Sequence, residues 1–440
     1  MTHALYDKYK DSNIGWLGAV PSHWKVTPLF AIASERSEKN FGMQEDNLLS
    51  LSYGHIVEKS IETLDGLLPA SFETYQIVYP DDIVMRLTDL QNDKRSLRSA
   101  IVKAKGIITS AYLALNPRTV NPAFLSYLLR AYDLTKVFYS MGGGLRQSMK
   151  FTDVKRLPIL LPEPVEQALI AKFLDRETAK IDDLVAEQER LIALLKEKRQ
   201  AVISHAVTKG LNRDVPMKDS GVEWLGEIPA HWEQLRFKDV CSEIVDCKNR
   251  TPDKKDNGQY FVVRTSCVRD GKFDSRGGYF TDEESFIEWT KKGRPSSDDV
   301  LFTREAPTGE ACIAPENLSF CLGQRMMYLR PDKEKTSAEF LLQSVYGPLV
   351  RSVVESKSRG STVGHLRVGE IGELPLLLPP IDEQILIVEA IANERQKLDE
   401  LYEKAQDAMR LLSERRAALV SAAVTGKIDV RGLVDTEEAA

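Results

Sequence analysis

The feature that most constrains this chain is residues 166–209, which predict one helix of 44 residues. Steps between its seam positions alternate four and three residues, as the a and d positions of a coiled coil do. At about 1.5 Å per residue such a helix is about 65 Å long. A single globular core does not cover that length, so the helix needs a helical partner. The seam positions are Ile170, Leu174, Glu177, Ile181, Leu184, Gln188, Leu191, Leu195, Lys198 and Val202.

The same pattern returns in the second half of the chain without insertion or deletion, so the partner lies in the same chain. Two residues are called equivalent in the helical repeat when they are separated in the sequence by the same number of positions as Ile170 and Ile387. We expect the two helices to pack antiparallel about a centre near residues 188 and 405. The second seam is Ile387, Ile391, Glu394, Leu398, Leu401, Ala405, Ala408, Leu412, Arg415 and Leu419.

Polar residues within the seam predict the register of this pair. If the helices are antiparallel, Glu177 falls close to Arg415, and Lys198 falls close to Glu394. Polar seam residues can fix the alignment of two helices, so we expect these two pairs to do so.

Both helices have the same beginning and the same end. Residues 157–164 and 374–381 each predict a short apolar strand that prolines stop, and Glu-Gln follows at 166–167 and 383–384. A carboxylate in the first turn complements the helix dipole. Gly210 and Gly426 mark the two ends.

A second repeat surrounds these helices, because nine of fifteen residues are identical between 10–24 and 218–232. The order is tryptophan segment, globular unit and long helix, and then the same three again. The globular units have diverged almost completely, which indicates a kept scaffold that carries two different reading units. The predicted domains are an N-terminal tryptophan segment (1–24), a first unit (25–156), a central helical region (157–210), a repeated tryptophan segment (211–232), a second unit (233–373), a distal helical region (374–428) and a flexible tail (429–440).

Both globular units are predicted to be mixed α/β. We expect strands at 83–85, 100–102 and 107–108 in the first unit, and at 261–263, 300–302 and 326–329 in the second. Helical segments follow from Pro122 to Tyr139 and from Ser337 to Glu355. The predicted class is therefore α+β: two mixed domains joined by an antiparallel coiled coil with an internal pseudo-twofold repeat.

Composition limits the compartment and the chemistry. No apolar run reaches membrane-spanning length and the N-terminus lacks a secretory pattern, so we expect a cytoplasmic protein with no membrane contact. The five cysteines are odd in number and form no Cys-x-x-Cys pair, which favours reduced thiols over disulfides or zinc. We expect no metal site.

The net charge of −6 means that any contact with DNA must come from local clusters. Lys and Arg suit phosphates, and Arg, Asn and Gln suit base edges. Solvated surface loops are the competing interpretation for any single residue. The candidate DNA-binding residues are Arg86, Thr88, Gln91, Asn92, Lys94, Arg95, Arg98, Arg146, Gln147 and Lys150 in the first unit, and Arg264, Thr265, Arg269, Lys291, Lys292, Arg294, Arg304, Lys357 and Arg359 in the second.

We find no enzyme signature. The chain has no phosphate-binding loop of the form G-x-x-x-x-G-K-[ST] and no G-x-G-x-x-G after a strand. A nuclease site at Asp332, Glu355 and Lys357 is disfavoured, because Glu355 is expected at a helix end rather than beside a sheet. His23 and His231 are better explained as parts of an aromatic turn that fixes the tryptophan segment. No catalytic residue is predicted.

At this point the chain resembles the specificity subunit of type I restriction-modification enzymes. The resemblance lies in the two Trp-Leu-Gly-x-x-Pro-x-His-Trp segments, the variable units, the proline-bounded strands with Glu-Gln, and the long helices. It implies a non-catalytic subunit whose two target-recognition domains read a gapped, asymmetric site in double-stranded DNA. It further implies two modification subunits that use S-adenosylmethionine, and two motor-nuclease restriction subunits that use ATP and magnesium.

Three other interpretations stay open at this stage. The chain could serve a restriction class whose modification subunit also cleaves, or it could be a coiled-coil adaptor that binds only proteins. A self-sufficient nuclease is the third. Salt-sensitive DNA binding separates the restriction interpretations from the adaptor, and cleavage by the isolated chain would identify the nuclease.

Overall fold

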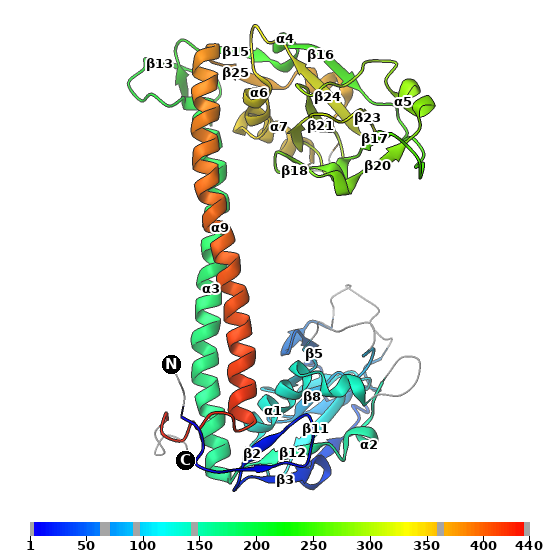
Figure 1. Cartoon of the computed structure of the whole chain (residues 1–440), viewed down its shortest axis with the longest axis vertical. Coiled ribbons are helices and arrows are strands. Elements are labelled where there is room, and N and C mark those ends of the chain that lie inside the picture. The colour runs from blue at the N-terminus through cyan, green and yellow to red at the C-terminus, as the bar shows by residue number, and fades with distance from the viewer. Residues whose placement is uncertain (1–3, 62–70, 91–96, 142–147, 359–364, 435–440) are drawn as a thin grey trace. The chain divides into compact units, whose positions relative to one another are not determined.

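The computed structural model describes residues 4–61, 71–90, 97–141, 148–358 and 365–434. The chain forms two compact units. Unit 1 is Met1–Gln188 with Gln406–Ala440, and unit 2 is Glu189–Ala405. Each unit takes one half of each long helix, α3 (Pro164–Lys209) and α9 (Ile381–Val424) (Figure 1). The chain is α+β, as the sequence predicts.

Unit 1 holds two four-stranded sheets. Neighbouring strands of the first are antiparallel, whereas β5 and β10 of the second are parallel. Helix α1 (Pro122–Leu134) packs against β9. The first sheet has the order β4 (Ala33–Arg36), β11 (Leu113–Pro117), β8 (Ile83–Met85), β9 (Ser99–Ile101); the second has the order β6 (His55–Lys59), β5 (Leu48–Ser52), β10 (Gly106–Ile108), β7 (Gln76–Val78).

Unit 2 contains a four-stranded sheet whose order corresponds to the first sheet of unit 1. A three-stranded sheet adds the parallel pair β17 and β23, and β18 (Val268–Arg269) forms a hairpin with β19 (Lys272–Phe273). The larger sheet has the order β16 (Cys241–Asp246), β24 (Met326–Pro331), β21 (Val300–Thr303), β22 (Ala311–Ile313); the smaller has the order β20 (Tyr279–Thr281), β17 (Tyr260–Val263), β23 (Phe320–Leu322).

The helical segments predicted within the globular units are each interrupted. Helix α1 ends at Leu134, and a short 3-10 turn, Val137–Ser140, follows it. In unit 2, α6 (Ala338–Val345) and α7 (Pro348–Ser358) are separate helices. Pro348 stands at the break, where proline lacks the N–H that a continuous helix requires.

A buried ion pair in each unit supports a shared frame. The Asp82 carboxylate accepts hydrogen bonds from Arg36 Nε and Nη2 at 3.0 and 3.1 Å. Asp299, which is equivalent in the helical repeat, accepts from Arg330 Nε and Nη2 at 2.8 and 3.0 Å. Each aspartate is buried and directly precedes a strand, β8 in unit 1 and β21 in unit 2.

The tryptophan segments form matching hairpins. β1 (Tyr9–Asp11) pairs with β2 (Ala19–Pro21), and β13 (Met217–Asp219) pairs with β14 (Glu227–Pro229). The next strand in each copy pairs with the proline-bounded strand that leads into a long helix. These pairs are β3 (Lys25–Pro28) with β12 (Pro158–Leu161), and β15 (Glu233–Arg236) with β25 (Pro375–Leu378).

The glutamate in the first turn of α3 anchors the first tryptophan segment. Glu166 Oε1 accepts hydrogen bonds from Trp24 Nε1 at 3.1 Å and from the Tyr6 hydroxyl at 2.8 Å. Its Oε2 lies 2.8 Å from His23 Nε2. The histidine therefore belongs to the predicted aromatic turn.

Unit 2 repeats this anchor with one contact fewer among its described residues. Glu383 Oε2 accepts from Trp232 Nε1 at 3.2 Å and lies 2.8 Å from His231 Nε2. Trp232 is completely buried, as Trp24 is in unit 1. By the offset that relates the two tryptophan segments, the position of Tyr6 carries Asp214, which has no aromatic ring to add.

The glutamine that follows each glutamate also has a structural role. Gln167 donates to Pro162 O at 2.8 Å and accepts from the N–H of Asn121 at 2.8 Å. Gln384 donates to Pro379 O at 2.9 Å and accepts from the Thr336 hydroxyl at 3.0 Å. The Glu-Gln pair thus joins the helix start to the tryptophan segment on one side and to the globular unit on the other.

The predicted helix seam needs a correction in its middle. Leu184, Leu191 and Leu401 are 47%, 39% and 45% exposed. Half-buried positions lie one residue later, at Val185, Ile192 and Tyr402. An α-helix has 3.6 residues per turn, so a strict 3.5-residue repeat drifts around its surface by about 20° per heptad. The sequence pattern ignores that drift.

The ion pairs between α3 and α9 lie off the predicted seam. In unit 1 Asp182 Oδ2 lies 3.3 Å from Arg416 Nη2, and in unit 2 Asp399 Oδ1 lies 3.5 Å from Arg199 Nη1. Asp182 is equivalent to Asp399 in the helical repeat, and Arg199 is equivalent to Arg416. Each unit therefore holds one copy of the same pair between its two helix halves.

The residues predicted to set the register have nearer partners on their own helices at two positions. Glu177 pairs with Lys180 at 2.8 Å, and Glu394 pairs with Lys397 at 2.7 Å. These lysines lower the pKa of each carboxyl, and Lys198 adds a smaller contribution at Glu394. A register role for Glu177, Lys198, Glu394 and Arg415 stays a prediction.

The tail that was predicted to be flexible is packed against unit 1 in its described residues, 429–434. The N–H of Asp429 donates to Ala4 O at 2.8 Å, and the Arg431 guanidinium lies 4.9 Å from the centre of the Tyr6 ring. Val430 is buried in the core of unit 1. Residues 429–434 therefore close unit 1 against the N-terminal segment.

All five cysteines are free. Burial raises the pKa of Cys312 and of Cys321 to about 12, so these thiols stay protonated at neutral pH. No helix among the described residues combines the length and the apolar character that crossing a membrane requires. Within the same residues, His, Cys, Asp and Glu form no group of three that could hold a metal ion.

Candidate DNA-binding surfaces

Seven of the candidate residues lie outside the described part of the chain. Four of them fall in 91–96, two in 142–147 and one in 359–364. Their proposed role stays a prediction. They are Gln91, Asn92, Lys94, Arg95, Arg146, Gln147 and Arg359.

Arg98 does not face DNA, which corrects the sequence prediction. Its side chain is completely buried. Nη1 donates to the carbonyls of Arg86 at 3.1 Å and Thr88 at 2.8 Å, and Nε donates to the Tyr139 hydroxyl at 3.0 Å. Arg98 holds the loop after β8 by satisfying its carbonyls, since a buried polar group needs a partner.

The other described candidates of unit 1 lie nearer the surface. Arg86 and Thr88 are half-buried on the loop that Arg98 fixes. Lys150 is exposed before the short helix α2 (Phe151–Val154), and its backbone N–H donates to Asp153 Oδ2 at 2.8 Å. A role for these three in binding DNA stays a prediction.

Arg304 is the second correction. It is 7% exposed, and its Nε lies 3.2 Å from Asp246 Oδ1. Its backbone carbonyl accepts from the N–H of Leu366 at 3.2 Å. Arg304 therefore stabilises the end of β21 from inside unit 2.

The remaining candidates in unit 2 are exposed, except for Thr265, which is half-buried. Arg264 lies 5.9 Å from the Tyr279 ring centre. Lys357, on α7, pairs with Glu370 at 2.7 Å. The exposed residues are Arg264, Arg269, Lys291, Lys292, Arg294 and Lys357.

The structure gathers some of them around Trp289 at the end of α5 (Glu283–Trp289). Lys248 Nζ lies 5.0 Å and Arg250 Cζ 5.1 Å from the Trp289 ring centre. Burial lowers the pKa of Lys248, and the charges of Arg250, Lys291 and Lys292 lower it further. Four cations and one indole thus share one surface, which we call the Trp289 cluster.

The Trp289 cluster suits nucleic acid. Cations that converge on one face contact the phosphate backbone, and an indole can stack on a base or sugar. The surface borders an open cavity of about 660 Å³ that also contains carboxylates, among them Glu288, which pairs with Lys248 and Lys291. Because the surface carries both cations and carboxylates, it favours contacts at defined positions over uniform attraction to the phosphate backbone.

The sequence pattern did not single out Lys248, Arg250 and Trp289. A usable signal was present, because Lys248-Asn249-Arg250 and Trp289-Thr290-Lys291-Lys292 both interleave cations with polar or aromatic residues. The two segments are far apart in the sequence, and only the fold brings them together.

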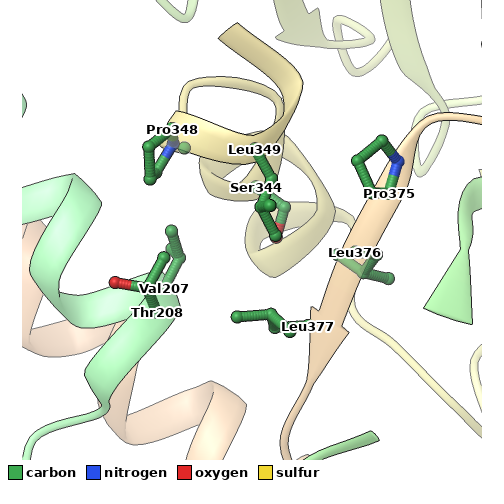
Figure 2. Close-up of a pocket in the computed structure, with 9 residues that line it drawn as sticks. Val207, Thr208, Ser344, Pro348, Leu349, Pro375, Leu376 and Leu377 are labelled. Carbon is green, nitrogen blue, oxygen red and sulfur yellow. The ribbon is translucent and has the colours of Figure 1, made fainter. Parts of the chain in front are cut away.

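A small cavity elsewhere in unit 2 is a packing gap (Figure 2). It lies among the end of α3, the α6–α7 junction and β25, and its volume of about 10 Å³ admits about one water molecule. The hydroxyls beside it are already satisfied, since Thr208 donates to Ser204 O and Ser344 to Phe340 O. We assign no ligand to it.

Comparison with known proteins gives a consistent result. Residues 229–405 match the family model of the type I restriction modification DNA specificity domain. The putative type I restriction enzyme MjaX specificity subunit of Methanocaldococcus jannaschii is 23% identical over 97% of this chain and 99% of its own length. The type I restriction enzyme EcoKI specificity subunit of Escherichia coli K12 is 24% identical over 93% of this chain and 90% of its own.

Solved structures agree on the fold. A chain from a type I R-M system, in a study of complex assembly and conformational transition, matches with a TM-score of 0.68 at 16% identity. The match covers 92% of this chain and 98% of that one. The HsdS subunit of Thermoanaerobacter tengcongensis matches with a TM-score of 0.51 at 16% identity, over 93% and 98%.

Proposed function

We propose that this chain, which belongs to the family of type I restriction-modification specificity subunits, selects the DNA sequence on which such an enzyme acts. The observation that carries the proposal is the match of residues 229–405 to a DNA specificity domain, within relatives that align over nearly the whole chain. The Trp289 cluster lies inside the matched segment.

The two units serve as two target-recognition domains on one repeated scaffold. Supporting features are the equivalent four-stranded sheets, the matched ion pairs of Asp82 and Asp299, and the two Glu-Trp anchors. We propose that α3 and α9 form an antiparallel coiled coil that relates the two domains by a pseudo-twofold axis. The equivalent ion pairs Asp182–Arg416 and Arg199–Asp399 favour this arrangement.

The half-sites should differ, because the surfaces of the two units differ. Unit 2 presents the Trp289 cluster, whereas the residue equivalent to Trp289 in the helical repeat is Phe72, whose side chain is buried. The full site is then a gapped, non-palindromic sequence. Its gap is set by the helices: four residues added to each helix lengthen it by about 6 Å, nearly two base pairs.

The helices also offer surface for protein partners. Several leucines on α3 and α9 are exposed, three of them at predicted seam positions. Large exposed apolar side chains that gather on one element mark interaction sites. We propose that modification subunits dock on this surface, two per specificity subunit, and that two restriction subunits complete the enzyme. The exposed leucines are Leu184, Leu191, Leu194, Leu386, Leu401 and Leu411.

In this proposal the chain itself performs no catalysis. Methyl transfer from S-adenosylmethionine belongs to the modification subunits, and the use of ATP and magnesium belongs to the restriction subunits. The described residues of this chain contribute DNA contacts and partner contacts. Because the target is cellular DNA, we place the complex in the cytoplasm.

The test is genome-wide adenine methylation in a host that expresses this chain with its modification subunit. We expect a new two-part motif that is absent when either protein is omitted. A modification subunit that is active and bound to this chain but yields no new motif would instead favour the protein-binding adaptor.

A further inference from the structure

Two hairpin turns, one in each unit, occupy equivalent positions in the helical repeat. Tyr53–Gly54 connects β5 to β6, and Asp270–Gly271 connects β18 to β19. Both residues of each turn have positive φ, at 43° and 81° in unit 1 and at 51° and 76° in unit 2. Such pairs define the tight turns that suit a two-residue hairpin.

In unit 2 three long side chains occupy the space between this turn and the elements that it packs against. The Tyr346 hydroxyl accepts from the N–H of Gly271 at 2.7 Å. Arg395 Nη2, from α9, donates to Asp270 O at 2.6 Å. Lys272 Nζ lies 3.6 Å from Asp399 Oδ2. The turn is thereby connected directly to α9.

In unit 1 the residues equivalent to Arg395 and Lys272 are shorter. Thr178 and His55 are equivalent to Arg395 and Lys272 in the helical repeat. Arg130 corresponds to Tyr346, because each residue follows the N-cap of its helix, α1 or α6, by the same number of positions. Arg130 Nη2 donates to Gly54 O at 2.6 Å. An open groove of about 490 Å³ results, bounded by β6, β9, α1, α3 and α9.

Three buried polar atoms around Arg130 are short of hydrogen-bond partners. Arg130 Nε, Asp133 Oδ1 and Ser99 Oγ have no partner among the atoms that the structure describes. Buried polar atoms are nearly always satisfied. Two of the three, Arg130 Nε and Ser99 Oγ, can donate, so they favour a ligand that accepts hydrogen bonds, whereas Asp133 Oδ1 can only accept.

The charges that border the groove favour an anion. Asp175 is engaged by the Tyr127 hydroxyl at 2.7 Å, and Asp182 by Arg416 at 3.3 Å. Arg130 and Lys103 also line the groove, and neither forms an ion pair with a described carboxylate. The described lining thus carries three cationic side chains, Lys103, Arg130 and Arg416, and two carboxylates.

Asp133 is the carboxyl that acts most directly on Arg130, without lining the groove. Burial raises the pKa of Asp133, and it lowers the pKa of Arg130 to about 10, where the charge of Asp133 opposes the decrease. The guanidinium therefore stays charged at neutral pH, and its burial makes an anionic partner favourable.

The pKa of His55 is shifted by the same excess of positive charge. Burial lowers the pKa of His55, and the charges of Arg130 and Arg416 lower it further, with a smaller contribution from Lys103. Only Asp182 acts in the opposite direction among the principal causes. The imidazole therefore lies in a positive field.

We propose that the groove of unit 1 binds a small phosphate-bearing molecule, no larger than a mononucleotide. A volume of about 490 Å³ falls in the range of small-molecule sites. Guanidinium and ammonium groups together suit a dianion, and arginine forks match phosphate oxygens. Among the described residues of unit 2, Tyr346, Arg395 and Lys272 fill the equivalent space.

Calorimetry on the purified full chain tests this proposal, with inorganic phosphate and adenosine monophosphate as probes at constant ionic strength. We expect one saturable site for at least one probe. Thr178→Arg should weaken binding roughly tenfold or more, about 1.4 kcal/mol. It does so although it adds a positive charge, because the new side chain occupies the groove as Arg395 does in unit 2.

Thr178→Val is the matched control, since it keeps the volume of the side chain and should keep the affinity within about twofold. A wild-type chain that binds neither probe, or a Thr178→Arg chain that binds equally well, would overturn the proposal. A third arm uses a short DNA duplex. If Thr178→Arg weakens duplex binding and leaves the small probes unaffected, the groove holds backbone phosphate instead, and the small-molecule site is refuted.

Bound phosphate should also raise the pKa of His55, because an anion opposes the field of Arg130 and Arg416. Histidine NMR titration of the chain with and without phosphate measures this shift. A chain that yields no methylation motif with its modification subunit but still shows the His55 shift would contradict the proposed function and leave this inference intact.

Discussion

The turn at Tyr53–Gly54 and the turn at Asp270–Gly271 have the same backbone and different surroundings. Long side chains from β19 and α9 connect the unit 2 turn to the helices, whereas shorter ones leave a groove in unit 1. By contrast, the anchors Trp24–Glu166 and Trp232–Glu383 have kept both sequence and geometry. Duplication thus preserved the anchor that attaches each unit to its helix, whereas the side chains around the two hairpin turns changed.

The largest effect should come from the preserved part. Trp24→Ala and Trp232→Ala each remove a completely buried indole, and each should lower the free energy of unfolding by about 3–5 kcal/mol. Chemical denaturation of the two variants measures this. Equal losses support equivalent anchors, and a loss below about 1 kcal/mol in either unit would contradict the equivalence.

Substitution of the two glutamates should lower the free energy of unfolding by unequal amounts. Glu166 contacts Tyr6, Trp24 and His23, and Glu383 contacts only the tryptophan and the histidine of its own segment among the described residues. Hydrogen bonds to a charged group contribute about 1.5–3 kcal/mol when buried. We expect Glu166→Gln to cost about 2 kcal/mol and Glu383→Gln about 1 kcal/mol.

Denaturation of both variants in the same buffer tests this order. Tyr6→Phe is the control, because it removes the extra donor and keeps the ring. In that background the two glutamine substitutions should cost nearly the same. A larger cost for Glu383→Gln would show that the additional Tyr6 contact does not strengthen the unit 1 anchor.

The Trp289 cluster belongs to the diverged part, so its loss should affect DNA binding and not stability. Lys291→Gln with Lys292→Gln should weaken DNA binding roughly tenfold and reduce the slope of log affinity against log salt by up to about 2. Lys397→Gln is a control, since this lysine also pairs with a glutamate three residues earlier on its own helix but lies on α9, outside the cluster. An unchanged salt slope in the double variant would remove the cluster from the DNA surface.

The smallest effect concerns the helix ion pairs. Asp182–Arg416 and Asp399–Arg199 are partly exposed, so each should contribute about 0.2–1 kcal/mol in a double-mutant cycle. Asp399→Asn should cost more than Asp182→Asn, because Asp399 also faces Lys272 at 3.6 Å. The reverse order would mean that the unit 2 turn gains nothing from its connection to the helices.

The frame could be predicted well because a repeat within one chain carries its own comparison. The two helices, the Glu-Trp segments and the aspartates at 82 and 299 all match at fixed offsets in the sequence. The helix seam was wrong in its middle, at Leu184 and Leu401, because a strict heptad pattern neglects the 3.6-residue turn.

The candidate site was harder to predict than the frame. Residue type alone cannot separate an arginine that faces DNA from one that is buried, so Arg98, which donates to buried carbonyls, and Arg304, which pairs with Asp246, were assigned wrongly. The Trp289 cluster was missed for the opposite reason, since its members are far apart in sequence and meet only when α5 packs beside Lys248 and Arg250. Long-range contacts decided both outcomes.

The central claim is that two units on one frame read two different half-sites. The most direct test is the adenine methylation motif of a hybrid in which residues 25–156 are replaced by a second copy of residues 233–373, expressed with the modification subunit. The account predicts that one half-site of the natural motif disappears and the other occurs twice, as an inverted repeat across the gap. A hybrid that methylates the natural motif, or one whose two half-sites both change, would contradict it.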